Sequence, residues 1–106
     1  MKPVMTIGKF GTKYWKLDDK IHREDGPAIE FKDGTKQWYK NGLFHRDDGP
    51  AIEQSKGTIQ WYINGKRHRE DGPAIEFGDG RNVWFINGYN ITSKIYEDIK
   101  DGRLKP

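Results

Sequence analysis

The stretch HREDGPAIE occupies residues 22–30 and recurs, letter for letter, at residues 68–76, and HRDDGPAIE stands between them at residues 45–53. A histidine, an arginine and two acidic residues in a row are typical of a catalytic or metal-binding site. Three copies within 106 residues are typical of a repeated structural unit. The stretch therefore has two interpretations, a chemical site or a joint between repeats.

A period of 23 residues runs through most of the chain. Residues 27–49 and 50–72 are identical at 15 of 23 positions, and tryptophan, glycine, histidine and proline return at this spacing. A fixed period of this length indicates a stacked-repeat architecture, in which the terminal units are atypical because one side has no neighbour. We expect one repeat domain over residues 1–106, with units at 4–26, 27–49, 50–72 and 73–95.

Each unit reads as a β-hairpin followed by a return segment. In the second unit PAIEF is a short strand, KDG a tight turn, and TKQWYK a second strand. Asn-Gly pairs at 41–42, 64–65 and 87–88 predict type I′ turns, in which both central residues have positive φ; Asp18-Asp19 fill this position in the first unit. The repeated proline marks the unit boundary because it has no N–H to donate to a ladder.

The segment after residue 88 departs from the repeat and predicts a helix at about 93–100. The residues that indicate it are a hydroxyl cap, an apolar stripe and a terminal glycine: Thr92 or Ser93, Ile95, Tyr96, Ile99 and Gly102. Such a helix would cover the open end of the last hairpin. The fold class predicted from the sequence is all-β, an elongated, twisted antiparallel meander of four 23-residue β-hairpin repeats with a short C-terminal capping helix.

The order of residues in a unit resembles the MORN repeat. The shared pattern is W-Y-x-N-G-x-x-H-x-x-x-G-P-x-x-x-x-x-x-G-x-x-x-W, and the resemblance covers residues 4 to about 92. The chain departs from it at HR-x-DGPAIE, where MORN units read His-Gly-x-Gly, and this variety is similar to repeats of phage and giant-virus proteins. The resemblance implies a binding or scaffolding role without catalytic residues, and a viral protein of this kind would inhibit or assist a host factor.

The histidines and carboxylates are interpreted as structural. Equivalent residues of successive units lie about 10 Å apart in such a meander, too far for His22, His45 and His68 to share a metal ion. An active site is needed once, whereas these residues repeat. We expect each aspartate to hold the Gly-Pro turn and each imidazole to donate to a backbone carbonyl. No catalytic residue, metal or cofactor is predicted; a hydrolase with a His–Asp pair is the remaining enzymatic alternative.

The arginines and the residues that follow the tryptophans are the predicted binding residues. Neighbours in a strand point to opposite faces, so one aromatic row forms the core, and the other is either an exposed track for binding or is buried by coiling of the sheet. The predicted ligand- or partner-binding residues are Arg23, Arg46, Arg69, Tyr39, Tyr62 and Phe85. The leading hypothesis is a non-enzymatic protein that engages a protein partner through one face or the edge of its sheet. The alternative is a protein that binds a small anionic ligand such as a nucleotide.

Charge and composition narrow these hypotheses. The net charge is only +3 at a pI of about 9.1, and every unit holds nearly equal numbers of basic and acidic residues, so a nucleic-acid partner is not predicted. The absence of cysteine excludes disulfides and thiolate metal sites. The sequence contains no apolar run typical of a signal peptide or a membrane span, and we expect a cytoplasmic protein, in the host cytoplasm for a viral one.

Overall fold

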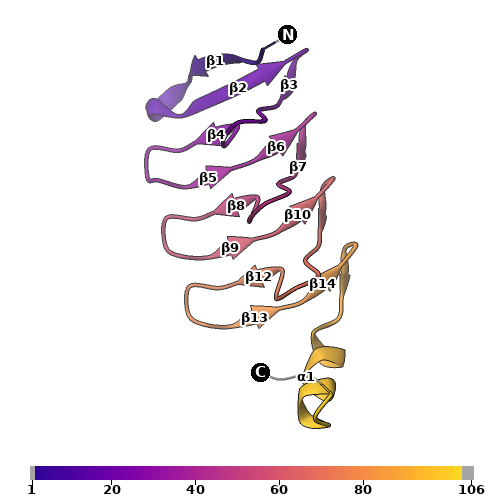
Figure 1. Cartoon of the computed structure of the whole chain (residues 1–106). Helices are drawn as coiled ribbons and strands as arrows, with labels where there is room; N and C mark the ends of the chain where they lie inside the picture. Colours follow the sequence, from indigo (N-terminus) through magenta and orange to yellow (C-terminus); the bar gives the residue numbers. More distant parts are fainter. Residues whose placement is uncertain (1, 104–106) are drawn as a thin grey trace.

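The computed structural model describes residues 2–103 and places the strands in a stack along the long axis of the molecule (Figure 1). The molecule measures 51 × 27 × 17 Å along its principal axes. Antiparallel hairpins follow one another in chain order, with the N-terminus at one end of the stack and a short helix at the other. The predicted fold class is confirmed.

Most strands belong to one nine-stranded antiparallel sheet. Its order is β1-β2-β4-β5-β8-β9-β12-β13, with β3 beside β2. The bounds are β1 (Val4–Ile7), β2 (Lys13–Leu17), β3 (Lys20–Ile21), β4 (Ile29–Glu30), β5 (Lys36–Gln37), β8 (Ile52–Glu53), β9 (Ile59–Gln60), β12 (Ile75–Glu76) and β13 (Asn82–Val83). A 3₁₀ turn, η1 (Lys9–Gly11), connects β1 to β2.

Three two-stranded hairpins extend from this sheet, and we call them the tip hairpins. They are β6 (Tyr39–Lys40) with β7 (Leu43–Phe44), β10 (Tyr62–Ile63) with β11 (Lys66–Arg67), and β14 (Phe85–Ile86) with β15 (Tyr89–Asn90). Their Asn-Gly turns have the predicted positive φ, for example 51° at Asn41 and 80° at Gly42. Asp18 and Asp19 adopt the same conformation, at 51° and 63°.

The second strand of each later unit is shorter than predicted. TKQWYK does not form one strand, because the structure divides it at Trp38 into β5 and β6. The register of β4 and β5, extended by two residues, places Pro27 opposite Tyr39. Proline has no N–H, so the ladder ends there, and the Tyr39 carbonyl instead accepts the N–H of Arg23 at 3.2 Å. The chain therefore changes partner at each tryptophan.

The first unit supports this explanation. Val4 has the position that proline has in the later units, and it pairs with Lys16. The ladder there continues, and β2 runs unbroken through Trp15. The proline, and not the tryptophan, therefore separates each tip hairpin from the sheet.

The apolar core is a thin column between units. Ala28, Ala51 and Ala74 are fully buried, and only Ile52 and Ile75 join them as buried apolar side chains among the described residues. The backbone N–H of each preceding tryptophan donates to an alanine carbonyl of the next unit, as from Trp38 to Ala51 at 2.7 Å. Because alanine buries little surface, most of the adhesion between units has to come from other contacts.

The helix α1 (Thr92–Lys100) ends the array. Gly102 follows the helix end, as predicted, with φ of 79°. The end is a Schellman motif, in which Gly102 donates to the Ile99 carbonyl and Arg103 donates to the Asp98 carbonyl. Hydrogen bonds from Lys94 and Arg103 to the Asp98 carboxylate hold the pKa of that group below its usual range. Among the described residues, no helix has the length and apolar character needed to cross a bilayer.

The predicted cap residue has a different role. Thr92 makes no N-terminal cap of the helix; its Oγ1 accepts the backbone N–H of Trp84 at 3.0 Å. In the inner units that N–H goes to the alanine of the following unit. Tyr96 packs edge-on against the Trp84 ring, with the ring centres 5.7 Å apart. The helix thus covers the Trp84 ring and supplies an acceptor for its backbone N–H. It does not pair with the sheet: β13 is the terminal strand and pairs, within residues 2–103, only with β12.

We predict that Thr92→Val lowers the free energy of unfolding by about 1 kcal/mol, because it keeps the side-chain shape and leaves the Trp84 N–H without its acceptor. Ser93→Ala, at the next and exposed helix position, is the control and is expected to change stability by less than about 0.5 kcal/mol. Urea denaturation followed by tryptophan fluorescence measures both. Equal stabilities for the two variants would contradict the assigned role of Thr92.

Candidate functional site

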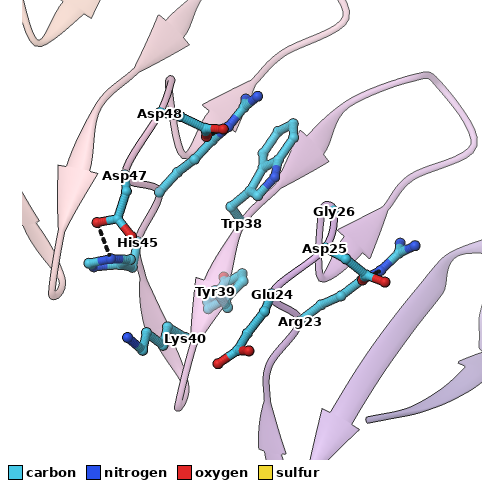
Figure 2. Close-up of a pocket in the computed structure, with 11 residues that line it drawn as sticks. Arg23, Glu24, Asp25, Gly26, Trp38, Tyr39, Lys40, His45, Asp47 and Asp48 are labelled. Carbon is cyan, nitrogen blue, oxygen red and sulfur yellow. Dashed lines mark hydrogen bonds and ion pairs between the residues drawn. The ribbon is translucent and has the colours of Figure 1, made fainter. Parts of the chain in front are cut away.

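The repeated stretch lies where each unit passes into the next. We call residues 22–27, 45–50 and 68–73 the three joints. They connect β3 to β4, β7 to β8 and β11 to β12, and each leads from the end of one hairpin to the first strand of the following unit. Figure 2 shows the first two joints side by side, with Trp38 between them. All three histidines, all three predicted arginines and six carboxylates belong to these segments.

The arginine of each joint is enclosed by its own unit boundary. The guanidinium carbon of Arg46 lies 3.9 Å from the centre of the Trp38 ring. Its Nε donates to Asp48 at 3.1 Å, and its Nη1 donates to the Pro50 carbonyl at 3.1 Å and to Glu53 at 2.8 Å. Stacking and a planar fork of donors are the two properties that distinguish arginine from lysine. Arg46 therefore fastens the turn, the tryptophan and the next strand together.

The other two arginines repeat this arrangement. Arg23 lies 3.9 Å from the Trp15 ring and Arg69 lies 4.1 Å from the Trp61 ring. Their side chains are 23% and 20% exposed, so both arginines are largely enclosed at their unit boundaries. The hydrogen bond and the charge of Arg23 hold the pKa of Asp25 below its usual range.

The glycine before each proline is required by the same arginine. A Cβ added at Gly49 would lie 2.8 Å from the guanidinium carbon of Arg46, and the equivalent distances at Gly26 and Gly72 are 3.0 and 2.9 Å. The Arg-x-Asp-Gly-Pro spacing was thus the signal in the sequence for a guanidinium seated on the turn. The aspartate does not hold the Gly-Pro turn as predicted: Asp48 contacts Arg46, and the arginine holds the proline carbonyl.

The imidazoles accept a backbone hydrogen bond where we expected them to donate one. His45 Nδ1 accepts the N–H of Asn64, in the turn of the next tip hairpin, at 3.0 Å. An imidazole that accepts at Nδ1 carries its hydrogen on Nε2, and Nε2 lies 2.9 Å from Asp47. His22 and His68 make the same contact, at 2.9 and 3.0 Å, with Asn41 and Asn87. Nδ1 of each histidine thus connects a joint to the next unit, while Nε2 faces a carboxylate of its own joint, at 3.6 Å for His22 and 3.5 Å for His68.

The second aromatic row forms a stack and not an exposed track. Tyr39 and Tyr62 are half-buried on either side of Phe44, with ring centres 4.4 and 5.0 Å from the Phe44 ring. Arg67 continues the stack, 5.4 Å from the Tyr62 ring and 5.5 Å from the Phe85 ring. Burial raises the pKa of Tyr39. These side chains connect the tip hairpins to one another.

A groove of about 610 Å³ separates the first two joints (Figure 2). Arg46 and Tyr39, which belong to the same unit, both line this groove, whereas Tyr62 does not. The four exposed carboxylates of the two joints also line it: Glu24, Asp25, Asp47 and Asp48. Lys40 lines the groove as well, so four carboxylates and three basic side chains give its wall a net charge of −1. Each arginine is already paired with carboxylates.

The joints separate the charges of the protein. Each joint and the strand after it hold one arginine and three carboxylates, a charge of −2, as in Arg46, Asp47, Asp48 and Glu53. Three such sets use 3 of the 19 basic and 9 of the 16 acidic residues, so they carry −6, and the rest of the chain, with 16 basic and 7 acidic residues, carries +9. The near-equal numbers of basic and acidic residues in each unit therefore conceal a negative net charge at the joints and the strands that follow them.

Comparison with known protein families, with curated proteins and with solved structures finds no match to this chain. Within residues 2–103, no group of three or more histidine and carboxylate side chains is placed to hold a metal ion. The geometry of the joints is therefore the basis on which a function is proposed.

We predict that Arg46→Ala lowers the free energy of unfolding by about 2 kcal/mol, because it removes the stack on Trp38 and leaves Glu53 without its partner. Arg46→Lys restores less than half of this loss, since lysine has no planar fork. Arg81→Ala is the matched control: Arg81 also stacks on an aromatic ring and pairs with Asp79, but its side chain is 71% exposed. Chemical denaturation of the three variants measures their free energies of unfolding. Equal losses of stability from Arg46→Ala and Arg81→Ala would show that Arg46 does not hold the units together.

Replacements of His45 test the direction of its hydrogen bond. Asparagine places an oxygen where Nδ1 stands and keeps the acceptor for the Asn64 N–H, whereas the glutamine amide reaches the position of Nε2. We expect His45→Asn to be more stable than His45→Gln by about 1 kcal/mol, measured by urea denaturation. The opposite order would show that the contact with Asp47 matters more than the contact with the next unit.

Proposed function

We propose that the protein is a non-enzymatic scaffold that binds a protein partner through the acidic surface of its joints. The observation that carries the proposal is the arrangement within each joint. Arginine and histidine face inward and fix the units, while the carboxylates beside them stay exposed. Asp47 and Asp48, for example, have side-chain exposures of 83% and 88%. The resemblance of the units to MORN repeats also favours a binding role, and for a viral protein the partner would be a host factor.

The geometry of the joints favours binding of a partner over catalysis of a reaction. A hydrolytic His–Asp pair needs one imidazole nitrogen free for the proton of the nucleophile or water. His45 faces Asp47 with Nε2, and its Nδ1 is engaged by the Asn64 amide. The bond at Nδ1 recurs at all three joints, as expected of a structural part.

The partner should present basic side chains. An anionic ligand would enter a groove lined by four exposed carboxylates and one further cation, Lys40, with Arg23 and Arg46 already paired, so the small-anion alternative is disfavoured. Lysine or arginine side chains of a protein fit this wall, because opposite charges across an interface guide association and fix its register. Repetition of the joint lets one partner contact several equivalent positions.

The test neutralises the carboxylates that face the histidines. Glu24→Gln, Asp47→Asn and Glu70→Gln together remove three exposed charges and keep the arginine contacts. Affinity capture with cross-linking, from lysate of the cells in which the protein occurs, is quantified by mass spectrometry. We expect the triple variant to lose a protein that the unaltered chain captures, and we expect that capture to weaken with added salt.

The control removes three exposed charges elsewhere, with Asp18→Asn, Asp19→Asn and Glu97→Gln. Asparagine tolerates the left-handed backbone at both turn positions, so this variant should fold and retain the partner. Identical capture by the triple variant and the unaltered chain would exclude the joints as the binding surface. Loss of the same protein by both variants would assign the effect to net charge alone.

A further inference from the structure

The first strand presents a free edge with a chemistry opposite to that of the joints. Within residues 2–103, β1 pairs only with β2. The N–H of Gly8 donates to the Thr12 carbonyl at 2.7 Å, in the same register as the β1–β2 ladder. Because hydrogen-bonded and non-hydrogen-bonded pairs alternate in an antiparallel ladder, the N–H and C=O groups of Met5 and Ile7 point away from β2. Two residues thus offer a complete set of main-chain donors and acceptors.

The side chains on this edge are apolar and exposed. Val4 is 68% and Ile7 62% exposed. Strands at the equivalent position of inner units are covered by the preceding unit, and Ile52, for example, is 8% exposed. The four residues of β1 include no charged residue, whereas protected edges usually place charge on the strand itself.

Phe10 adds an exposed ring beside the same edge. It follows β1 in η1, is 86% exposed, and has φ of 61°. An aromatic residue with left-handed backbone is an outlier, and such strain is found preferentially at functional sites. The equivalent positions of the later units hold Asp33, Lys56 and Asp79, which do not have positive φ.

The charges around the edge select its occupant. Residues 2–17 contain four exposed lysines and no carboxylate: Lys2, Lys9, Lys13 and Lys16. Symmetric antiparallel pairing of β1 with a second copy has to set Met5 opposite Ile7, because these are the residues whose N–H and C=O groups point outward. Lys9 of each copy then lies opposite Pro3 and beside Lys2 of the other copy, and repulsion between these like charges disfavours self-pairing. An acidic segment has the complementary charge.

We propose that β1 binds an extended acidic segment of a partner protein by adding it as a further antiparallel strand. Four residues of the segment pair with Val4–Ile7, and their apolar side chains lie beside those of the strand. Carboxylates seven residues apart, at the two ends of the segment, lie opposite Lys2 and Lys9. The protein then joins two partners of opposite charge, a basic one at the joints and an acidic one at this edge.

A charge-exchange experiment tests the proposal with defined peptides. One fluorescent eight-residue peptide has glutamate at each end and alternating valine and threonine between; a second has lysine at each end. Fluorescence anisotropy with the full chain is expected to give about tenfold tighter binding of the glutamate peptide at low salt. The variant with Lys2→Glu and Lys9→Glu should reverse this preference. The control, with Lys56→Glu and Lys66→Glu at exposed positions of a middle unit, should keep it.

A glutamate peptide with N-methylated backbone amides separates strand addition from simple charge attraction, and we expect it not to bind. Equal binding of the methylated peptide, equal binding of both end-charged peptides, or binding of neither would overturn the proposal. Sedimentation of the protein alone gives the remaining outcome: a concentration-dependent dimer abolished by Ile7→Pro, which removes an outward N–H, would assign the edge to a second copy and overturn it too.

Discussion

The stack of a guanidinium on an indole ring is the contact on which the rest of the array depends. The apolar column between units consists of three alanines and two isoleucines among the described residues, too little to hold the units by area alone. Arg46 compensates because it contacts one unit through Trp38 and the next through Pro50 and Glu53. The requirement for glycine before each proline follows from this contact.

An array built from such joints has to end differently at its two ends. At the C-terminal end no described residue supplies a further alanine carbonyl, and position 92 holds threonine where the earlier units have arginine. The helix α1 replaces both contacts: Thr92 accepts the Trp84 N–H and Tyr96 packs on the ring. At the other end β1 keeps an edge without a partner among residues 2–103. The two ends are therefore chemically distinct, although the units between them are nearly identical.

The sequence was sufficient for the features that depend on local chemistry. The period, the type I′ turns and the Gly102 terminus were predicted because each is specified within a few residues. The break at Trp38 was missed because it depends on Pro27 standing opposite Tyr39, across two strands. The direction of the His45 bond was missed for a similar reason, since its partner amide, at Asn64, lies 19 residues away. Contacts between units require the register, which no single unit specifies.

In this repeat protein, the residue types most typical of active sites are the ones most engaged in holding the units together. Histidine, arginine and aspartate recur in register because each inner boundary is held by the same contacts, which engage Nδ1 of the imidazole and the donors of the arginine. The chemistry available to a partner is what these contacts leave over. At the joints that is a surplus of two negative charges per boundary, and beside β1 it is a strand edge without a partner among residues 2–103, with the four lysines of residues 2–17. Function in such an array is to be sought in the unbalanced charge of the joints and where the repetition stops.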